Sequence, residues 1–413
     1  FGTDSFNHQK ELSREKIVNF DVLVINLYPF EETVNKTKNF DEIIEMIDIG
    51  GHSLIRAAVK NFRKTITLLD PLDYKIFIKN YHKTETTKKN YAIKAMQKIT
   101  EYDVAISNWF QGIQNKEYSL RYGENPQQSA IALINNKSFE QLSGNKKLSY
   151  NNLLDLDAAV NIAYRSSTKE NICTIVKHNI PCGGSIKKTQ KESYKKALEG
   201  DPLSAFGGII AFNKKLSKTT AKLIIQNFYE VIAAPDFEKG VLDILKTKIN
   251  LRVLKVKKFN NKVEQRSIFA GALIQDINNK SSSIKEVRGR NKLKKDKIDF
   301  FINILKYIKS NAIAVFDQDS LISQSGGQTS RVDALQNCFY KLKLKHNKKN
   351  IDKLFLFSDA FFPFTDSLKF IRNQKIKIDI YAPMGSQNDK KIEEYVKKNN
   401  LNFFRLSDRH FKH

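Results

Sequence analysis

Long apolar runs are missing from this 413-residue sequence. The longest ones lie around Phe20–Phe30 and Leu354–Phe364, and both fall short of the roughly 18 residues that a transmembrane helix needs. The N-terminal residues also lack the basic stretch, apolar core and small-residue cleavage site of a secretory signal. We therefore expect neither a membrane span nor a cleaved leader, although a chain that begins at Phe1 is expected to be a fragment or a processed product.

Cysteine is scarce, with only Cys173, Cys182 and Cys338. Three cysteines cannot build a disulfide framework, which favours a reducing, cytoplasmic setting. Pro181–Cys182 resembles the start of the Pro-Cys-x-x-Cys element of zinc-dependent deaminases, but Ser185 occupies the second ligand position and no His-x-Glu precedes it. Histidine and cysteine reach ligand spacing nowhere else in the sequence. We expect no metal site.

Acidic residues are too few to balance the basic ones. The sequence has 70 Lys and Arg against 44 Asp and Glu, a net charge of +26, which suggests an anionic partner such as nucleic acid, a phosphorylated metabolite or a membrane surface. Lysine is dispersed, there is one Trp, and no RNP-like aromatic motif occurs, which argues against nucleic acid. A basic nucleic-acid-binding protein is therefore kept as an alternative to an enzyme. A third possibility is a protein that has lost its catalytic activity and only dimerises.

Short apolar runs alternate with longer amphipathic ones, which predicts an α/β architecture, and no repeat of solenoid length is found. Strands are predicted at Phe20–Asn26, Thr65–Leu69, Ile172–Val176, Gly208–Phe212, Ala312–Phe316, Leu354–Phe357, Ile376–Tyr381 and Phe403–Leu406. Helices are predicted at Asp41–Ile47 continuing through Ser53–Asn61, and at Asp155–Arg165, Glu192–Leu198, Lys218–Phe228, Asp299–Lys309 and Lys390–Asn399. A change of composition at Gln111–Lys116 predicts two domains, residues 1–115 and 116–413.

Polar and glycine-rich residues follow several predicted strands. They include Lys177–Asn179, then Pro181–Gly184, then Ser358–Asp359 and Pro383–Ser386. Because ligands of open α/β sheets bind beyond the carboxyl ends of the strands, these segments predict one crevice assembled from several loops.

The adjacent Lys177 and His178 are the strongest candidates for chemistry. An imidazole with an ordinary pKa of ~6.5 can take a proton from a nucleophile near neutral pH. A neighbouring lysine can hold an anionic substrate or stabilise a developing oxyanion. The competing interpretation is a solvated lysine beside a histidine that bonds to nearby backbone. Gly183–Gly184 favours the functional interpretation, because glycines permit close backbone approach to a ligand.

Three other glycine-containing segments are candidate anion-binding loops: Gly50–Gly51 before a predicted helix, Ser204–Gly208, and Ser325–Arg331. The free N–H groups and dipole at a helix N-terminus favour phosphate. A loop before a solvated helix explains Gly50–Gly51 equally well, and Ser204–Gly208 could also be a tight turn. The last one lacks the Gly-x-x-x-x-Gly-Lys-Ser/Thr pattern of a nucleoside-triphosphate loop.

Eleven stretches, in order along almost the whole chain, together resemble one family. They are Asn26–Phe30, Ile47–Gly51, Arg56–Asn61, Leu120–Pro126, Leu148–Asp155, Val176–Asn179, Asp201–Gly208, Lys309–Asn311, Gly327–Arg331, Ser358–Phe364 and Arg409–His413. The sequence resembles the bifunctional purine biosynthesis family that combines AICAR transformylase with IMP cyclohydrolase.

The resemblance implies two reactions. Residues 116–413 would form a deaminase-like α/β transformylase that moves a formyl group from the co-substrate 10-formyltetrahydrofolate to the 5-amino group of AICAR. Residues 1–115 would be part of a methylglyoxal-synthase-like domain that closes the product to IMP with loss of water. Members work as homodimers whose transformylase sites are shared across the interface. Because the family has several tens of residues before the position of Phe1, we expect ring closure to be impaired in this chain.

The resemblance also implies residue roles in the transformylase. His178 is the general base, Lys177 assists at the transition state, and Asn311 orients the amine and the formyl oxygen. The positions that bind AICAR are Arg121, Tyr122, Gly207, Glu230, Arg331 and Arg409. The positions that bind folate are Val332, Phe361, Ser386 and Gln387. An arginine suits a phosphate because its planar fork donates two bonds at once, and an aromatic ring can lie against the pterin.

In the cyclohydrolase, the resemblance implies that Lys60 is the proton shuttle and that Tyr28 and Asp48 support it. The nucleotide contacts would be Ile25, Asn26 and Ile49.

Overall fold

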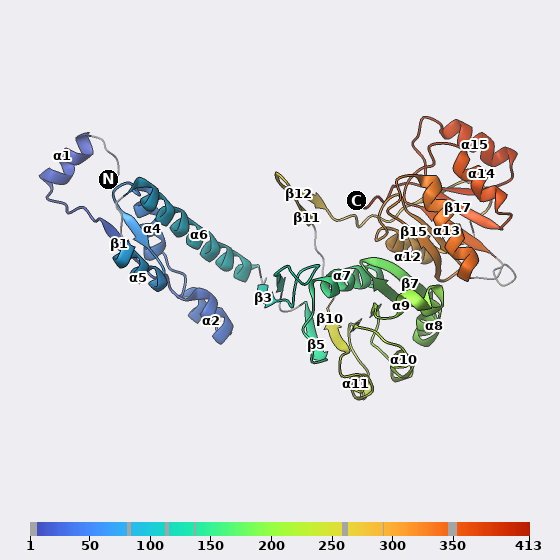
Figure 1. Cartoon of the computed structure of the whole chain (residues 1–413), viewed down its shortest axis with the longest axis horizontal. Helices are drawn as coiled ribbons and strands as arrows, with labels where there is room; N and C mark the ends of the chain where they lie inside the picture. Colours follow the sequence, from blue (N-terminus) through green and yellow to red (C-terminus); the bar gives the residue numbers. More distant parts are fainter. Residues whose placement is uncertain are drawn as a thin grey trace. The chain divides into compact units, whose positions relative to one another are not determined.

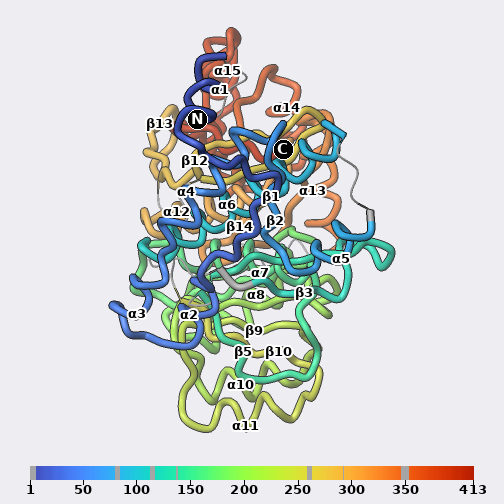
Figure 2. Tube along the Cα trace, turned by 90° about the vertical axis from the view of Figure 1, so that its left-hand side faces the viewer, coloured from blue at the N-terminus to red at the C-terminus, as the bar shows by residue number. Residues whose placement is uncertain are grey.

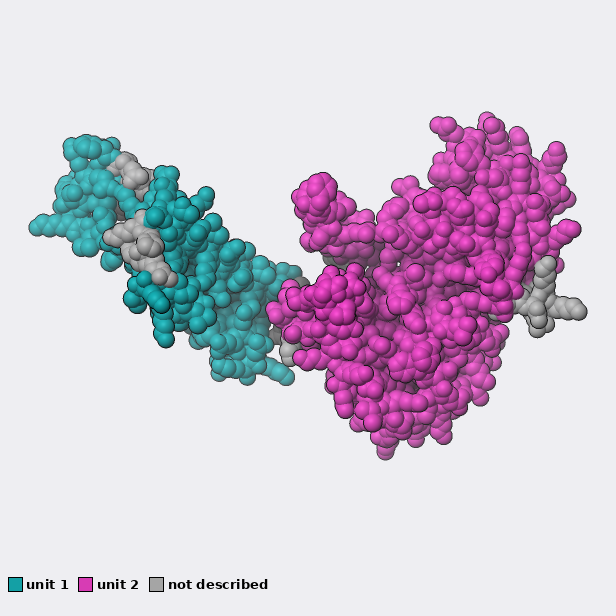
Figure 3. Space-filling view, in the orientation of Figure 1, with its two compact units in different colours: residues 1–115 teal, residues 116–413 magenta. Residues whose placement is uncertain are grey.

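The computed structural model describes residues 6–80, 84–111, 115–135, 138–257, 263–291, 293–345 and 353–413. The chain divides into two compact units, Phe1–Asn115 and Lys116–His413 (Figure 3). The boundary segment expected at Gln111–Lys116 includes residues 112–114, which lie outside the described residues. No helix among the described residues is both long and apolar enough to cross a membrane.

The first unit contains a two-stranded parallel sheet of β1 (Val22–Val24) and β2 (Ile66–Leu68) with helices around it. The helices are α1 (Phe6–Arg14), α2 (Phe30–Lys36), α3 (Phe40–Ile44), α4 (Gly50–Lys60), α5 (Pro71–Asn80) and α6 (Glu85–Phe110). The long helix α6 buries Ala95 and Ile99 against Ile55 of α4. Both α4, which ends at the predicted site residue Lys60, and α6 contact β2 of the sheet.

The predicted continuous helix from Asp41 to Asn61 is wrong. Helix α3 ends at Ile44 and a new helix, α4, begins at Gly50. The Asp48 carboxylate accepts the backbone N–H of Gly51 at 2.7 Å, so it satisfies a free donor at the start of the new helix. A polar capping residue of this kind favours a helix start over a helix interior.

The second unit contains two six-stranded sheets. The first has the order β5-β10-β9-β8-β6-β7, with β5 (Phe139–Ser143), β6 (Asn171–Lys177), β7 (Ile180–Lys187), β8 (Ile209–Phe212), β9 (Val231–Ala234) and β10 (Arg252–Val256). The second has the order β13-β18-β17-β16-β14-β15, with β13 (Ile284–Arg288), β14 (Ile313–Phe316), β15 (Leu321–Ser325), β16 (Leu354–Ser358), β17 (Ile378–Pro383) and β18 (Asn402–Leu406).

Each sheet has three parallel strands, one antiparallel strand at one edge and an antiparallel hairpin at the other. The helices follow the same plan. In the first copy they are α7 (Tyr150–Tyr164), α8 (Gln190–Gly200), α9 (Pro202–Ala205), α10 (Lys218–Ile224) and α11 (Val241–Lys246), and in the second α12 (Lys295–Leu305), α13 (Arg331–Lys345), α14 (Asp366–Asn373) and α15 (Asp389–Lys398). One topology therefore occurs twice, in the green-to-yellow and the orange-to-red parts of Figures 1 and 2.

The two sheets meet along their hairpin edges, where β7 lies beside β15. Ser185 forms an antiparallel bridge with Ser320, and the N–H of Ile186 donates to the carbonyl of Asp319 at 2.9 Å. Because the two strands run in opposite directions, the start of β7 lies next to the end of β15. The β6–β7 turn and the loop after β15 are therefore on one side of the unit.

Two short pairs complete the second unit. Strands β3 (Asn115–Ser119) and β4 (Ile131–Asn135) pair before the first copy. Strands β11 (Val263–Ile268) and β12 (Gly271–Asp276) form an antiparallel hairpin between the copies, whose residues are all exposed and which stands out from the unit in Figure 1.

The mixed α/β class and all eight predicted strands are confirmed, with ends that shift by one or two residues. Three further helices differ by more than two residues from their predicted ends: α7 begins at Tyr150, α10 stops at Ile224, and α12 begins at Lys295 and stops at Leu305. Pro181–Gly184 is not a loop but part of β7. A Cβ at Gly183 would collide with the carbonyl oxygen of Ala197, and one at Gly184 would lie 2.6 Å from Cδ1 of Ile304. These glycines therefore make room for α8 and α12 rather than for a ligand.

Candidate active site

The His178 side chain stands at the tip of the β6–β7 hairpin. His178 and Asn179 are the two turn residues, with φ of 56° and 59°, and they connect the paired Lys177 and Ile180. Positive φ at both central positions is the geometry of the tight hairpin turn that follows strand twist. The Asp155 carboxylate, on α7, accepts the His178 N–H at 3.1 Å and also the N–H of Asn179. The exposed imidazole therefore lies on a turn whose two backbone N–H groups are bound by a carboxylate of α7.

The Asp155 side chain is half-buried. Burial raises the pKa of its carboxyl, and the two backbone N–H donors and His178 oppose that rise. The turn that this carboxylate supports therefore favours its charged form, against the effect of burial.

Lys177 precedes the turn and points to the segment before β8. Its Nζ donates to the carbonyl of Phe206 at 2.7 Å. Gly207 has a φ of 74° and donates its N–H to the carbonyl of Phe228 at 2.8 Å. A left-handed residue of this kind is favourable for glycine, so this segment is a tight turn that lies next to the lysine.

Strand register places Glu230 at the same end of the sheet as Lys177 and Gly207. It directly precedes β9, as Gly207 and Gly208 precede β8 and Arg252 opens β10. Its Oε2 accepts from Nδ2 of Asn152 at 2.8 Å and from Nη2 of Arg252 at 2.8 Å. Arg252 is 2% exposed, and burial lowers its pKa. The glutamate is therefore fixed by one amide and one buried cation.

The loop with Arg121 and Tyr122 lies close to this pair. The charge of Arg121 lowers the pKa of Arg252, while Tyr122 raises it. The Arg121 guanidinium lies 5.3 Å from the centre of the Tyr122 ring. Asn151 of α7 donates to the carbonyl of Glu124 at 3.1 Å, which ties the loop to the start of the helix that carries Asp155.

A second group of predicted residues gathers at the ends of β15, β16 and β17. Asn311 precedes β14, and its backbone N and side-chain Nδ2 donate to the carbonyl of Gln328 at 3.0 and 2.9 Å. Nδ2 also donates to the carbonyl of Thr329 at 3.1 Å. No described residue donates to Oδ1 of Asn311, so this oxygen is the polar atom left for a ligand.

Arg331 opens α13 and is buried. Its Nη1 donates to the Asp359 carboxylate, to Oγ of Ser358 at 3.1 Å and to the carbonyl of Ala312 at 3.3 Å. Its Nε and Nη2 make no hydrogen bond within the described part of the chain. One side of the fork is thus bound to protein and the other is left for an anion. Val332 follows and is half-buried.

The predicted folate residues lie on two adjoining loops. Phe361 follows β16, while Ser386 and Gln387 follow β17. Nδ2 of Asn388 donates to the carbonyl of Pro363 at 2.9 Å, which joins the loops. The Ser386 hydroxyl already donates to Asp389 at 2.9 Å, and Gln387 is exposed.

Arg409 lies exposed on the C-terminal tail, with its guanidinium 5.1 Å from the centre of the Phe411 ring. The N–H of the next residue, His410, donates to the carbonyl of Asp359 at 2.8 Å. The tail is therefore attached to the end of β16, close to Arg331.

In the first unit, Asp48 joins two of the predicted residues. Its carboxylate accepts from the N–H of Gly51 and, at 3.4 Å, from the N–H of Tyr28. The Tyr102 hydroxyl accepts the N–H of Asp48 at 2.8 Å and donates to the carbonyl of Met46 at 2.8 Å. The loop that holds Asp48 is therefore fixed by α6, which the sequence did not predict.

The nucleotide-contact positions are nearby. The N–H of Ile25 donates to the carbonyl of Leu68 at 3.0 Å, and Oδ1 of Asn26 accepts from the Tyr74 hydroxyl at 2.7 Å. Ile49 is 77% exposed. Lys60 ends α4, about 15 Å along the helix from its start at 1.5 Å per residue. The structure does not bring Lys60 to Asp48, so its role stays a prediction.

Comparison with known proteins gives one consistent result. The sequence model of a family described as "AICARFT/IMPCHase bienzyme" matches residues 58–341. The chain belongs to this family. A bifunctional purine biosynthesis protein PurH from Persephonella marina is 38% identical, with 99% of this chain and 85% of the relative covered. PurH proteins from Fusobacterium nucleatum (37% identical) and Clostridium botulinum strain Loch Maree (38% identical) each match 99% of this chain and 84% of their own length. The nucleic-acid-binding alternative is not supported.

Several residues of this AICARFT/IMPCHase chain were missed by the assignment of roles from sequence. Asn152 and Asp155 lie in the matched stretch Leu148–Asp155, and Ser310 and Asp359 lie in two other matched stretches. The sequence feature that could have identified these four residues is that each is a polar residue within a stretch that matches the family. Arg252 lies in none of these stretches and becomes visible only through its burial against Glu230.

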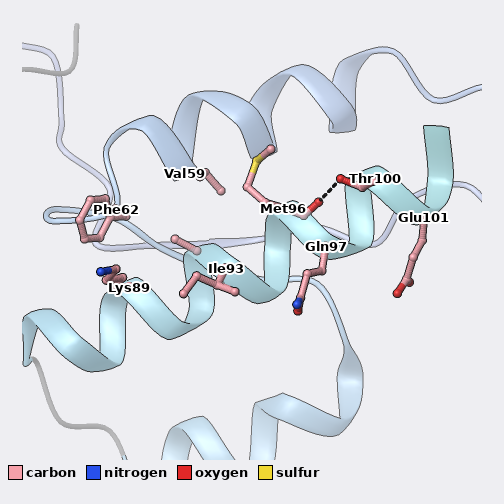
Figure 4. Close-up of a pocket in the computed structure, with 9 residues that line it drawn as sticks. Val59, Phe62, Lys89, Ile93, Met96, Gln97, Thr100 and Glu101 are labelled. Carbon is pink, nitrogen blue, oxygen red and sulfur yellow. Dashed lines mark hydrogen bonds between the residues drawn. The ribbon is translucent and has the colours of Figure 1, made fainter. Parts of the chain in front are cut away.

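Two cavities of this family member do not coincide with the predicted sites. One, of about 760 Å³, is a groove of the first unit lined by Val59, Phe62, Ile93 and Met96, among others (Figure 4). The other, of about 830 Å³, lies between the β3–β4 pair and β5 of the second unit. The predicted site residues line neither of them. Over the described residues, no group of three or more His, Cys, Asp or Glu side chains could hold a metal ion.

Proposed function

We propose that the chain catalyses the last two steps of IMP synthesis. It transfers the formyl group of 10-formyltetrahydrofolate to the 5-amino group of AICAR, giving FAICAR and tetrahydrofolate, and it closes FAICAR to IMP with loss of water. Unit Lys116–His413 is the transformylase with a deaminase-like fold, and unit Phe1–Asn115 carries the cyclohydrolase with a methylglyoxal-synthase-like fold. Membership in the AICARFT/IMPCHase family supports both assignments.

The observation that carries the transformylase assignment is the arrangement of one edge of the second unit. Lys177 and His178 are on the β6–β7 turn, and Glu230 is beside them by register. The antiparallel contact of β7 with β15 places the Asn311 and Arg331 loops on that same side. A base, two cations, a carboxylate and an amide oxygen therefore line one edge.

His178 removes a proton from the AICAR amine as its nitrogen attacks the formyl carbon. The amine needs this help because its lone pair is delocalised into an imidazole that bears a carboxamide. Attack turns the formyl oxygen into an oxyanion, which the Lys177 ammonium stabilises, while Asn311 orients the amine and the formyl oxygen. Collapse of this intermediate breaks the bond to N10 of the folate, which takes up a proton as it leaves.

Binding residues surround this centre. Arg121, Tyr122, Gly207, Glu230, Arg331 and Arg409 hold AICAR, and the open donors of Arg331 suit an anion. Val332, Phe361, Ser386 and Gln387 hold the folate, and the joined loops after β16 and β17 support this grouping. In the cyclohydrolase, Tyr28 and Asp48 support Lys60 as proton shuttle, while Ile25, Asn26 and Ile49 contact the nucleotide.

The protein acts as a homodimer in the cytoplasm, and its transformylase sites are shared between subunits. The exposed β11–β12 hairpin supports an association surface, because Phe269, Leu273 and Ile274 are all solvent-exposed apolar residues. No metal ion takes part in the proposed chemistry.

The test is His178→Ala. Loss of the base is expected to lower kcat for formyl transfer by roughly 10²–10⁴-fold with little effect on folding, because the side chain is exposed. His52→Ala, in the first unit, is the matched control and is expected to keep the wild-type transfer rate. Formyl transfer at the wild-type rate in His178→Ala would refute the assigned role.

A further inference from the structure

One buried carboxylate connects the residues of the second group. Asp359 follows β16 and is 0% exposed. One carboxylate oxygen accepts from Nη1 of Arg331, and the other accepts from the Ser310 hydroxyl at 2.6 Å. Its backbone N–H donates to the carbonyl of Ala312 at 3.3 Å, and its carbonyl accepts the N–H of His410 at 2.8 Å. All four polar groups of the residue are therefore used.

Each contact of Asp359 leads to a different residue of the proposed site. Arg331 is bonded directly. Ser310 is the neighbour of Asn311, and His410 is the neighbour of Arg409. Phe361 is two residues further along the same loop. Four site positions from β14, β16, α13 and the C-terminal tail thus share one anchor.

Further bonds at Ser310 reinforce the link with the tail. Its backbone N–H donates to the carbonyl of Lys412 at 2.8 Å, and its hydroxyl accepts the N–H of Lys412 at 3.1 Å. The Asp359 carboxylate is the acceptor that orients this hydroxyl toward the tail N–H. A carboxylate in the protein interior needs such partners, because a buried charge without them is costly.

We propose that Asp359 is a positioning residue of the transformylase, a role that rests on the proposed function. It holds Nη1 of Arg331 so that Nε and Nη2 of the fork face the AICAR side. It also fixes the backbone on which Asn311 and Arg409 stand. Asp359 touches no reacting atom and acts through these three residues.

The experiment compares Asp359→Asn with Asp379→Asn in the full chain. Asp379 is a matched control: it is 1% exposed, pairs with Nζ of Lys353 at 2.7 Å and accepts from Nδ2 of Asn402 at 2.7 Å. Asp379 lies near the start of β17, whereas Asp359 follows the end of the neighbouring parallel strand β16. The two carboxylates are therefore at opposite ends of the strands of one sheet. Steady-state kinetics give KM for AICAR, and thermal unfolding gives Tm.

Asp359→Asn is expected to raise KM for AICAR by roughly 10- to 100-fold, the loss typical of a charge-assisted hydrogen bond. Asp379→Asn is expected to lower Tm to a similar extent and to change that KM less than twofold. A rise below threefold in Asp359→Asn, or an equal rise in both variants, overturns the proposal. Should Asp359→Asn fail to fold, Ser310→Ala is the second variant, with an expected rise of at least threefold, and a smaller rise overturns the proposal.

Wild-type turnover separates this proposal from the proposed function. Wild-type formation of FAICAR with an unchanged Asp359→Asn variant refutes the positioning role alone. A wild-type chain without turnover refutes the proposed function, and calorimetric titration with AICAR then decides the positioning role through the ratio of the Kd values. A wild-type chain that neither reacts nor binds AICAR refutes both.

Discussion

The Asp155 carboxylate accepts the backbone N–H of His178 at 3.1 Å from below the β6–β7 turn. It also accepts the N–H of Asn179, so both residues of the turn are held by one side chain. Both have positive φ, a conformation that costs a non-glycine residue free energy. The carboxylate offsets that cost and sets where the proposed base stands.

Removal of this acceptor is expected to reduce catalysis. In Asp155→Ala the two turn N–H groups lose their partner, and we expect kcat for formyl transfer to fall roughly 10- to 100-fold because the base moves. Asp157→Ala is the control, since that carboxylate lies two residues along α7 and accepts from Asn161 at 2.8 Å instead. Equal rates for Asp155→Ala and wild type in a FAICAR formation assay would contradict this account.

The position of this turn shows what the sequence could and could not predict. Apolar runs marked β6 and the polar residues Lys177 and His178 after it. The direction of β6 was not visible, and it is antiparallel to β8. The turn therefore lies at the amino ends of the parallel strands in its own sheet, not at the carboxyl ends as expected. Only the partner strand of β6 fixes this, and a single sequence does not show which strands pair.

The same limit applies to charged residues whose partners lie far away in sequence. Arg331 was predicted as a ligand-binding residue, but its bond to Asp359 needs the end of β16 to reach α13. Arg252 and Glu230 meet because β9 and β10 are adjacent and parallel. The residue types in each motif identified candidate site residues from the sequence alone. Which motifs contact each other depends on the order of the strands in the sheets.

Gly184 gives a test of packing against ligand binding. A Cβ there would lie 2.6 Å from Cδ1 of Ile304, so Gly184→Ala is expected to lower the free energy of unfolding by roughly 1–3 kcal/mol through overpacking. Ile304→Val removes Cδ1 and is expected to recover part of this loss in the double variant. Chemical denaturation of the two single variants and the double variant gives the coupling energy. Strictly additive losses would argue against direct contact.

The Gly50–Gly51 pair in the first unit allows a comparison of neighbours. A Cβ at Gly51 would lie 2.7 Å from Oδ2 of Asp48, whereas a Cβ at Gly50 meets nothing within 4 Å. Gly51→Ala is therefore expected to displace Asp48 from Tyr28 and to weaken the cap of α4, at a cost of roughly 1 kcal/mol. Gly50→Ala is expected to keep wild-type behaviour. Thermal unfolding and FAICAR cyclisation are the measurements, and equal losses in both variants would rule out the Asp48 contact as the cause.

The buried His410 of the C-terminal tail makes folding stability depend on pH. It is 0% exposed, with Nε2 2.8 Å from Oγ of Ser282. Burial, followed by the charge of Lys306, lowers its pKa to about 4. The folded chain therefore binds this proton less readily than the unfolded chain, whose imidazole has an ordinary pKa of ~6.5. The stability contribution is complete above that ordinary value and is lost as the pH falls toward 4.

His410→Asn is expected to reduce the acid sensitivity of the second unit. In the wild type, protonation of this imidazole costs roughly 3 kcal/mol of unfolding free energy between neutral pH and pH 4, since each pKa unit is worth about 1.4 kcal/mol. The variant is less stable at neutral pH, because it loses the contact with Ser282, but its stability should fall less on acidification. Denaturation at pH 7.5 and pH 5 measures the difference, with His413→Asn, an exposed position on the same tail, as the control that keeps the wild-type slope. The same fall in stability for His410→Asn and wild type would mean that other groups cause the acid sensitivity and that the tail stays attached when His410 is protonated.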